Sequence, residues 1–189
     1  MTVTRVAHNT IAHLIGKVIA TLLGVVTIGI MTRYLGQEQF GWYTTAIGFL
    51  QIVGIMIDFG LVLVTGQMLG SAVAGAEKRI IHNILAFRII TAFIAYVAAG
   101  GIIWFFPYNL EIKLAVQTAS FAFFLIAVNQ ILTGIFQKHL QAVWVGIGEA
   151  IQRAALLISV LVVMRWDHGF LAIMIATVAA GIVQTVVLA

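Results

Sequence analysis

Long apolar stretches recur along the whole chain, each bounded by charged residues, glycine or the single proline. They predict six spans, at about residues 11–32, 43–66, 83–106, 114–136, 146–164 and 170–189. A helix needs roughly 20 such residues to cross about 30 Å of hydrocarbon. The stretches lack the apolar–polar alternation of barrel strands, and helices satisfy their own backbone hydrogen bonds in lipid. The sequence therefore predicts an all-α polytopic membrane protein with a six-transmembrane-helix bundle.

Composition leads to the same class. Hydrophobic residues make up 62% of the 189 residues and charged residues only 8%, whereas a soluble domain carries about 25% charged residues. The connections between spans are short, so residues 1–189 are expected to form a single transmembrane domain with no separate catalytic domain. The net charge of +4 comes from basic residues scattered at the span ends rather than gathered in a patch. We therefore expect no nucleic acid partner.

The basic residues are distributed unequally between the two sides of the predicted membrane. Seven fall on the side of the N-terminus, namely Arg5, Lys17, Lys78, Arg79, Arg88, Lys138 and Arg153, and three fall opposite, namely Arg33, Lys113 and Arg165. Cytoplasmic loops carry the excess of Lys and Arg, so both ends are predicted to be cytoplasmic. The last span stops at Ala189 without a polar flank, from which we expect a fragment or one half of a larger protein.

Span 43–66 carries polar residues at seven-residue spacing, among them Gln51 and Asp58, which places them on one helix face. Asp58 has no cation near it in sequence, and an unpaired carboxylate inside a membrane costs about 2.5–3.5 kcal/mol on insertion scales. Asp58 therefore needs a partner, a proton or water. A structural role as a helix cap or interhelical lock stays equally open, because Gly60 follows closely.

Other charged side chains fall in the cytoplasmic half of the predicted bundle. Lys17, Arg88 and Arg153 lie about five to seven residues inside the interface, from where snorkelling is an alternative to a functional role. Glu149 and Arg153 have the i, i+4 spacing of a helical ion pair. The candidates to line an inward-opening, hydrated cavity are Lys17, Gln51, Asp58, Arg88, Glu149 and Arg153. Their excess of cations favours an anionic substrate.

Motifs of catalysis and nucleotide binding are missing from the sequence. It contains no Walker A loop, no G-x-G-x-x-G, no H-E-x-x-H, no G-x-S-x-G and no cysteine. We accordingly predict no enzyme activity, no catalytic residue, no metal ligand and no bound cofactor, apart from an open choice of proton or sodium ion for coupling at Asp58 or Glu149.

The segment Thr32–Tyr43, which reads TRYLGQEQFGWY, is followed in the next span by Asp58-Phe59-Gly60-Leu61. This ordered pair resembles the N-terminal signature of bacterial polysaccharide biosynthesis flippases, the oligosaccharide branch of the multidrug/oligosaccharidyl-lipid/polysaccharide exporter superfamily. The residues that carry the resemblance are Arg33, Tyr34, Leu35, Gly36, Phe40, Gly41, Tyr43, Asp58, Phe59 and Gly60.

The resemblance implies a protein of two pseudo-symmetric helical bundles in the bacterial plasma membrane. Such proteins move a polyprenyl-pyrophosphate-linked oligosaccharide from the cytoplasmic to the outer leaflet by alternating access. This chain would be the first bundle, with a C-terminal bundle or a second copy as its partner. Arg33, Gly36, Phe40 and Gly41 would shape the first outer turn. Lys17, Arg88 and Arg153 would be candidates for the family's cationic cavity.

Two other functions stay open at this stage. A multidrug efflux transporter of the same superfamily would share the bundle, but its cavity should carry acidic residues for cationic drugs. A non-transporting membrane assembly protein needs no cavity, so its polar stripes should be buried and dry.

Overall fold

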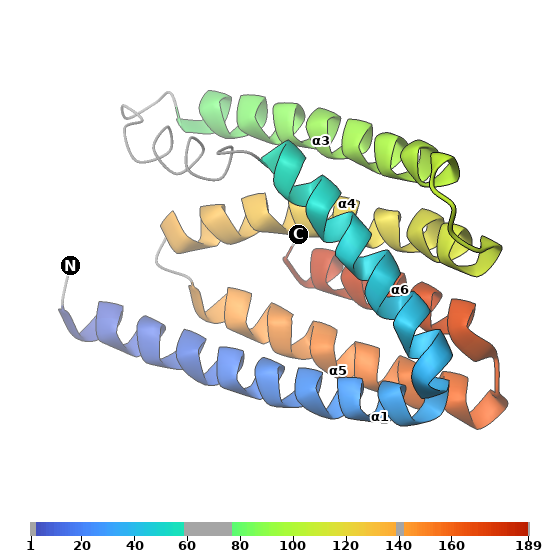
Figure 1. The fold of residues 1–189 in the computed structure, drawn as a ribbon. Helices are drawn as coiled ribbons and strands as arrows, with labels where there is room; N and C mark the ends of the chain where they lie inside the picture. Colours follow the sequence, from blue (N-terminus) through green and yellow to red (C-terminus); the bar gives the residue numbers. More distant parts are fainter. Residues whose placement is uncertain (1–2, 59–76, 139–141, 189) are drawn as a thin grey trace.

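A computed structural model describes residues 3–58, 77–138 and 142–188 (Figure 1). The elements are α1 (Val3–Asp58), α3 (Glu77–Ile102), the short 3-10 helix η1 (Ile103–Phe105), α4 (Leu110–Lys138), α5 (Ala142–Trp166) and α6 (Gly169–Leu188). Within these ranges the chain forms helices and short turns and no strand. The all-α class is therefore confirmed.

Five helices of the described ranges are long and apolar enough to cross a membrane. They confirm a polytopic helical bundle, while six separate helices are not shown in this part of the chain. The predicted spans 11–32 and 43–66 are joined in one bent helix, α1. Residues 59–66 of the second span lie outside the described residues.

The bend in α1 is made by one residue. Gly36 has φ 66° and ψ −177°, while the helix continues on both sides of it. This backbone region is essentially restricted to glycine, because a Cβ atom would clash with the neighbouring backbone. We call residues 3–35 the first arm of α1 and residues 37–58 the second arm. The predicted outer turn thus shrinks to Gly36, and Phe40 and Gly41 belong to the helical second arm instead.

The two arms pack against different helices. α1 makes its most extensive contacts with α5, and further contacts join α5 to α6, α6 to α4 and α4 to α3. Figure 1 shows the first arm running along α5, with the second arm crossing in front of α4 and α6. The core between them consists of small and aliphatic side chains that are almost fully buried, including Met31, Ala46, Val116, Val160 and Ile173.

The outside of the bundle is apolar as well. Leu22 and Val25 on α1 and Ile158 on α5 each expose about half or more of their surface. A water-soluble protein rarely exposes contiguous apolar patches of this kind. Lipid is the solvent that such a surface fits, which agrees with five membrane-crossing helices.

The first arm and α5 approach each other until their backbones touch. A Cβ atom added at Gly16 would lie 2.9 Å from the carbonyl carbon, Cα and oxygen of Gly146. Further along the two helices, Gly24 lies against Arg153. Because both contacts advance in the same direction, the first arm and α5 run parallel. Small residues are the usual means by which membrane helices approach so closely.

Hydrogen bonds join the bend of α1 to the turn between α5 and α6. The Tyr34 hydroxyl donates to Oδ1 of Asp167 at 3.0 Å and accepts from the backbone N–H of Gly169 at 3.2 Å. Leu35, the next residue, is buried in the core. Tyr34 and Leu35, which belong to the Thr32–Tyr43 segment, therefore hold the bend at Gly36 in place.

Replacing Gly36 by alanine should destabilise the protein by about 1–3 kcal/mol, because alanine would be forced into the strained backbone conformation. The measurement is the midpoint of thermal unfolding in detergent. Gly29→Ala is the matched control, since its Cβ would meet no atom within 4 Å in an ordinary helical position. An unchanged midpoint for Gly36→Ala would contradict the bend.

Gly16→Ala should cost about 1–3 kcal/mol for a different reason, namely that the new methyl group would overlap the Gly146 backbone and push α1 away from α5. The same unfolding measurement applies. Equal stability of Gly16→Ala and Gly29→Ala would show that the two helices are not in backbone contact.

Candidate functional site

The structure divides the predicted cavity residues into two groups. Lys17, Glu149 and Arg153 lie on α1 and α5, whereas Gln51 and Arg88 line a cavity between the second arm, α3 and α4. Asp58 is the last residue of α1 in the described range, and its side chain lies outside the described part, as do Phe59 and Gly60. Two of the six candidates, Gln51 and Arg88, therefore line the same cavity.

Arg153 lies where the first arm of α1 meets α5. A Cβ atom on Gly24 would be 3.8 Å from Cδ, Nε and Cζ of Arg153, so the guanidinium group extends across this glycine. Arg153 itself is exposed. The cation therefore lies against the first arm of α1.

Lys17 and Glu149 flank this position. Lys17 precedes Gly24 by seven residues, which puts it on the same face of the first arm, and it is exposed. Glu149 precedes Arg153 by four residues on α5 and is half-buried. We call Lys17, Gly24, Glu149 and Arg153 the α1–α5 seam.

The ion pair predicted between Glu149 and Arg153 is wrong. Both side chains belong to the part of the chain that the structure describes, and no ion pair joins Glu149 to Arg153 there. The Arg153 side chain instead lies against Gly24 on the neighbouring helix.

Arg153 also lies further from the start of the apolar stretch than the predicted span 146–164 implied, because that stretch begins at Val143. α5 begins at Ala142, so Arg153 follows its first residue by eleven positions, or about 16 Å at 1.5 Å per residue. A cation at such a depth needs water or an anion beside it. The seam is consequently a candidate for a hydrated anion path.

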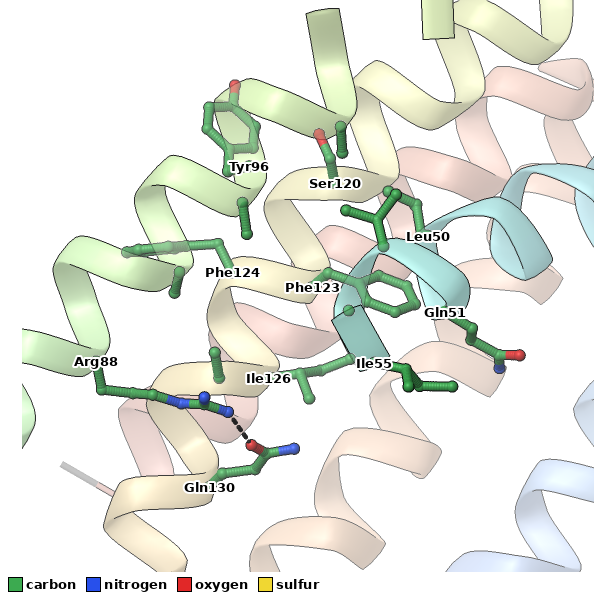
Figure 2. A pocket seen from close by; sticks show the side chains of 16 residues that line it. Leu50, Gln51, Ile55, Arg88, Tyr96, Ser120, Phe123, Phe124, Ile126 and Gln130 are labelled. Atoms are coloured by element: carbon green, nitrogen blue, oxygen red, sulfur yellow. Dashed lines mark hydrogen bonds between the residues drawn. The ribbon is translucent and has the colours of Figure 1, made fainter. Parts of the chain in front are cut away.

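The cavity has a volume of about 270 Å³ and lies between the second arm of α1, α3 and α4 (Figure 2). Apolar, aromatic and small side chains dominate its wall. The lining residues are Leu50, Gln51, Val53, Gly54, Ile55, Arg88, Ala92, Ala95, Tyr96, Ala99, Ser120, Phe123, Phe124, Ile126, Ala127 and Gln130. Its volume is slightly below the 300–1,000 Å³ of typical small-molecule sites.

Arg88 and Gln130 form the polar end of this cavity, as Figure 2 shows. Nη2 of Arg88 donates to Oε1 of Gln130 at 2.6 Å, and only 5% of the Arg88 surface is exposed. A hydrogen bond with a charged donor is short and strong. Sequence reasoning missed Gln130. The adjacent amides Asn129 and Gln130 inside a predicted span were the available signal.

Asn129 faces the other way, toward α6. Its Nδ2 donates to Oε1 of Gln184 at 3.3 Å, and both side chains are buried. Oδ1 of Asn129 has no partner among the described residues. Nowhere in the described ranges do three His, Asp or Glu side chains lie together as they would to hold a metal ion.

Five apolar helices and polar groups between them define a multi-pass helical membrane protein. A profile of the family described as polysaccharide biosynthesis protein matches residues 6–189, and the chain belongs to that family. This match confirms the family that the sequence resembles and indicates a role in polysaccharide biosynthesis or export. No curated protein and no solved structure matches the chain.

The environment of the seam can be tested with single cysteines, because the natural chain has none. Lys17→Cys and Arg153→Cys should react with a membrane-impermeant thiol reagent, since a thiol reacts as the thiolate and needs water around it. Ile158→Cys is the matched control on α5, being 61% exposed but on the apolar side. Seam cysteines as inert as the control would contradict a hydrated path.

Proposed function

We propose that the protein moves a polyprenyl-pyrophosphate-linked oligosaccharide from the cytoplasmic to the outer leaflet of the bacterial inner membrane, for the synthesis of cell-surface polysaccharide. Family membership supports the pathway, and the five apolar helices support the location in a membrane. The observation that carries the proposal is Arg153, a membrane-embedded cation in the α1–α5 seam.

An arginine inside a membrane helix is costly and is retained where it meets water or an anion. Arg153 is exposed on the bundle, about 16 Å into α5. A pyrophosphate group cannot cross about 30 Å of hydrocarbon unaided. The planar guanidinium group binds phosphate oxygens through two parallel hydrogen bonds, which makes Arg153 a suitable ligand along the path.

The neighbouring residues support an anionic cargo. Gly24 leaves the guanidinium group accessible, because a larger side chain at this position would lie directly against it. Lys17 adds a second cation on the first arm, about 10 Å closer than Gly24 to the start of α1. Glu149 is the single carboxylate of the seam, so its charge balance is positive. A cationic drug would be repelled by this balance, and Glu149 is instead our candidate for binding a coupling proton or sodium ion.

Alternating access requires a second wall facing the seam. We propose that a second helical bundle, from a longer chain or from another copy, supplies it. In this arrangement both ends of the bundle face the cytoplasm, as the distribution of basic residues predicts. The lipid tail stays in the bilayer while the pyrophosphate and sugars pass along the seam.

Arg153→Gln should lower export of lipid-linked oligosaccharide about 10-fold or more, because it removes a charge-assisted contact worth about 1.5–3 kcal/mol. Export is measured as surface polysaccharide in cells that lack another copy of the gene, with membrane abundance of the protein as a check on folding. Arg165→Gln, in the last turn of α5, is the matched control and should export normally.

Arg153→Lys should fall between the wild type and Arg153→Gln, because lysine keeps the charge but loses the two parallel hydrogen bonds. Normal export by Arg153→Gln at normal abundance would remove the seam from the substrate path.

A further inference from the structure

His13 lies on the first arm of α1, one turn before Lys17 and on the same helix face. Its side chain is half-buried against α5, since a Cβ atom added at Gly146 would lie 3.4 Å from Nδ1 of His13. Because Gly146 has no side chain, the imidazole ring can lie directly on the backbone of α5.

The two nitrogens of this ring have different surroundings. Nδ1 faces Gly146, is buried, and has no hydrogen-bond partner among the described residues. Nε2 is the accessible nitrogen of the half-buried ring, and no hydrogen bond occupies it within the same ranges. One edge of the ring is therefore sealed against α5, while the other edge is open.

This difference determines which nitrogen of a neutral His13 carries the proton. A neutral imidazole has one N–H donor and one acceptor nitrogen. The Cα–H bond of Gly146 that a Cβ atom would replace points at Nδ1, and a C–H group is a weak donor that faces an acceptor. Buried N–H groups without an acceptor are also rarer than buried acceptors without a donor. The neutral ring consequently carries its proton on Nε2.

His13 lies at one end of the seam, at a membrane boundary. The apolar stretch of α1 begins at His13, and that of α5 begins at Val143, three residues before Gly146. Lys17 follows about 6 Å further along the first arm, and Arg153 lies deeper still. Headgroups lie at the edge of the hydrocarbon. A lipid-linked anion that enters the seam from this side, which is the cytoplasmic side by the predicted orientation, therefore meets His13 first.

We propose that His13 and Lys17 bind the pyrophosphate group of a lipid at the mouth of the seam, with the Nε2–H group of His13 donating to one phosphate and the Lys17 ammonium donating to the other. The inference rests on the proposed function. Side chains four residues apart on a helix are neighbours, and Lys17 is exposed. Phosphate oxygens are strong acceptors, so the site must present donors, as these two side chains do.

Glu149 is the charged group that α5 contributes near this position. It follows Gly146 by three residues and is half-buried. Its carboxylate offsets the charge of Lys17, so charge alone gives the mouth little preference for an anion. A neutral N–H donor at His13 adds affinity without adding another charge, and the pyrophosphate can then pass on to the cation at Arg153.

The test is binding of farnesyl pyrophosphate, a short polyprenyl pyrophosphate, to the protein in lipid nanodiscs. His13→Asn should weaken this binding about 10-fold, because a hydrogen bond to a charged group is lost. His13→Gln should retain the affinity, because its longer side chain places an amide N–H near the position of Nε2. His168→Asn, at an exposed histidine beyond the opposite end of α5, is the matched control and should bind like the wild type.

Equal affinity of His13→Asn and the wild type would overturn the proposal. An equal loss in His13→Asn and His13→Gln would overturn the donor role of Nε2. Inorganic pyrophosphate is the second probe and should bind more weakly than farnesyl pyrophosphate. Binding of both with equal affinity would assign the site to a free anion and overturn its assignment to a lipid.

The position of the proton can also be measured without a loss of stability, by NMR of labelled imidazole nitrogens in the wild-type protein. The signals of His13 are those that His13→Gln lacks. We expect the neutral ring to carry its proton on Nε2, and a proton on Nδ1 would overturn the proposal even if His13→Asn is not recovered as folded protein.

Export of lipid-linked oligosaccharide separates this inference from the proposed function. Lowered export by both His13→Asn and Arg153→Gln would support the two together. Normal binding by His13→Asn, with export lowered by Arg153→Gln, would overturn the role of His13 alone. Weak binding by His13→Asn, with normal export by both variants, would contradict transport along the seam and leave the pyrophosphate site in place.

Discussion

The backbone contact between Gly16 and Gly146 sets the distance between α1 and α5, and the other features of the bundle depend on it. With the helices this close, the Arg153 side chain of α5 lies across Gly24 of the first arm. The bend at Gly36 then directs the second arm away from α5 and over α4. The close approach of Gly16 to Gly146 and the backbone conformation of Gly36 thus position the helices that form the seam and the cavity.

The two polar regions accommodate an arginine within an apolar helix differently. Arg88 is almost fully buried and hydrogen-bonded to Gln130, at the edge of the membrane. Arg153 is exposed and deeper, with no ion pair in the described ranges. A buried, hydrogen-bonded arginine is held in place by the protein, while an exposed arginine is accessible to a passing ligand. This contrast underlies our assignment of the moving pyrophosphate to Arg153.

The helical class and the approximate spans could be predicted, because apolar stretches of about 20 residues leave few alternatives in a membrane. The family could be predicted from the Thr32–Tyr43 segment. The helix through residues 37–43 could not be predicted, since the polar residues and the glycine there also fit a loop. The absent Glu149–Arg153 pair and the Arg88–Gln130 bond depend on neighbouring helices, and single-helix periodicity carries no information on which helices meet.

The central claim is transbilayer movement of an anionic lipid-linked oligosaccharide, and its most direct test is reconstitution. The intact protein would be placed in vesicles carrying the lipid-linked oligosaccharide, and exposure of the sugar to an external glycosidase would be followed over time under a proton or sodium gradient. Our account predicts that sugar initially in the inner leaflet becomes accessible only in vesicles containing the protein. Accessibility no greater than in protein-free vesicles, with either gradient, would contradict it.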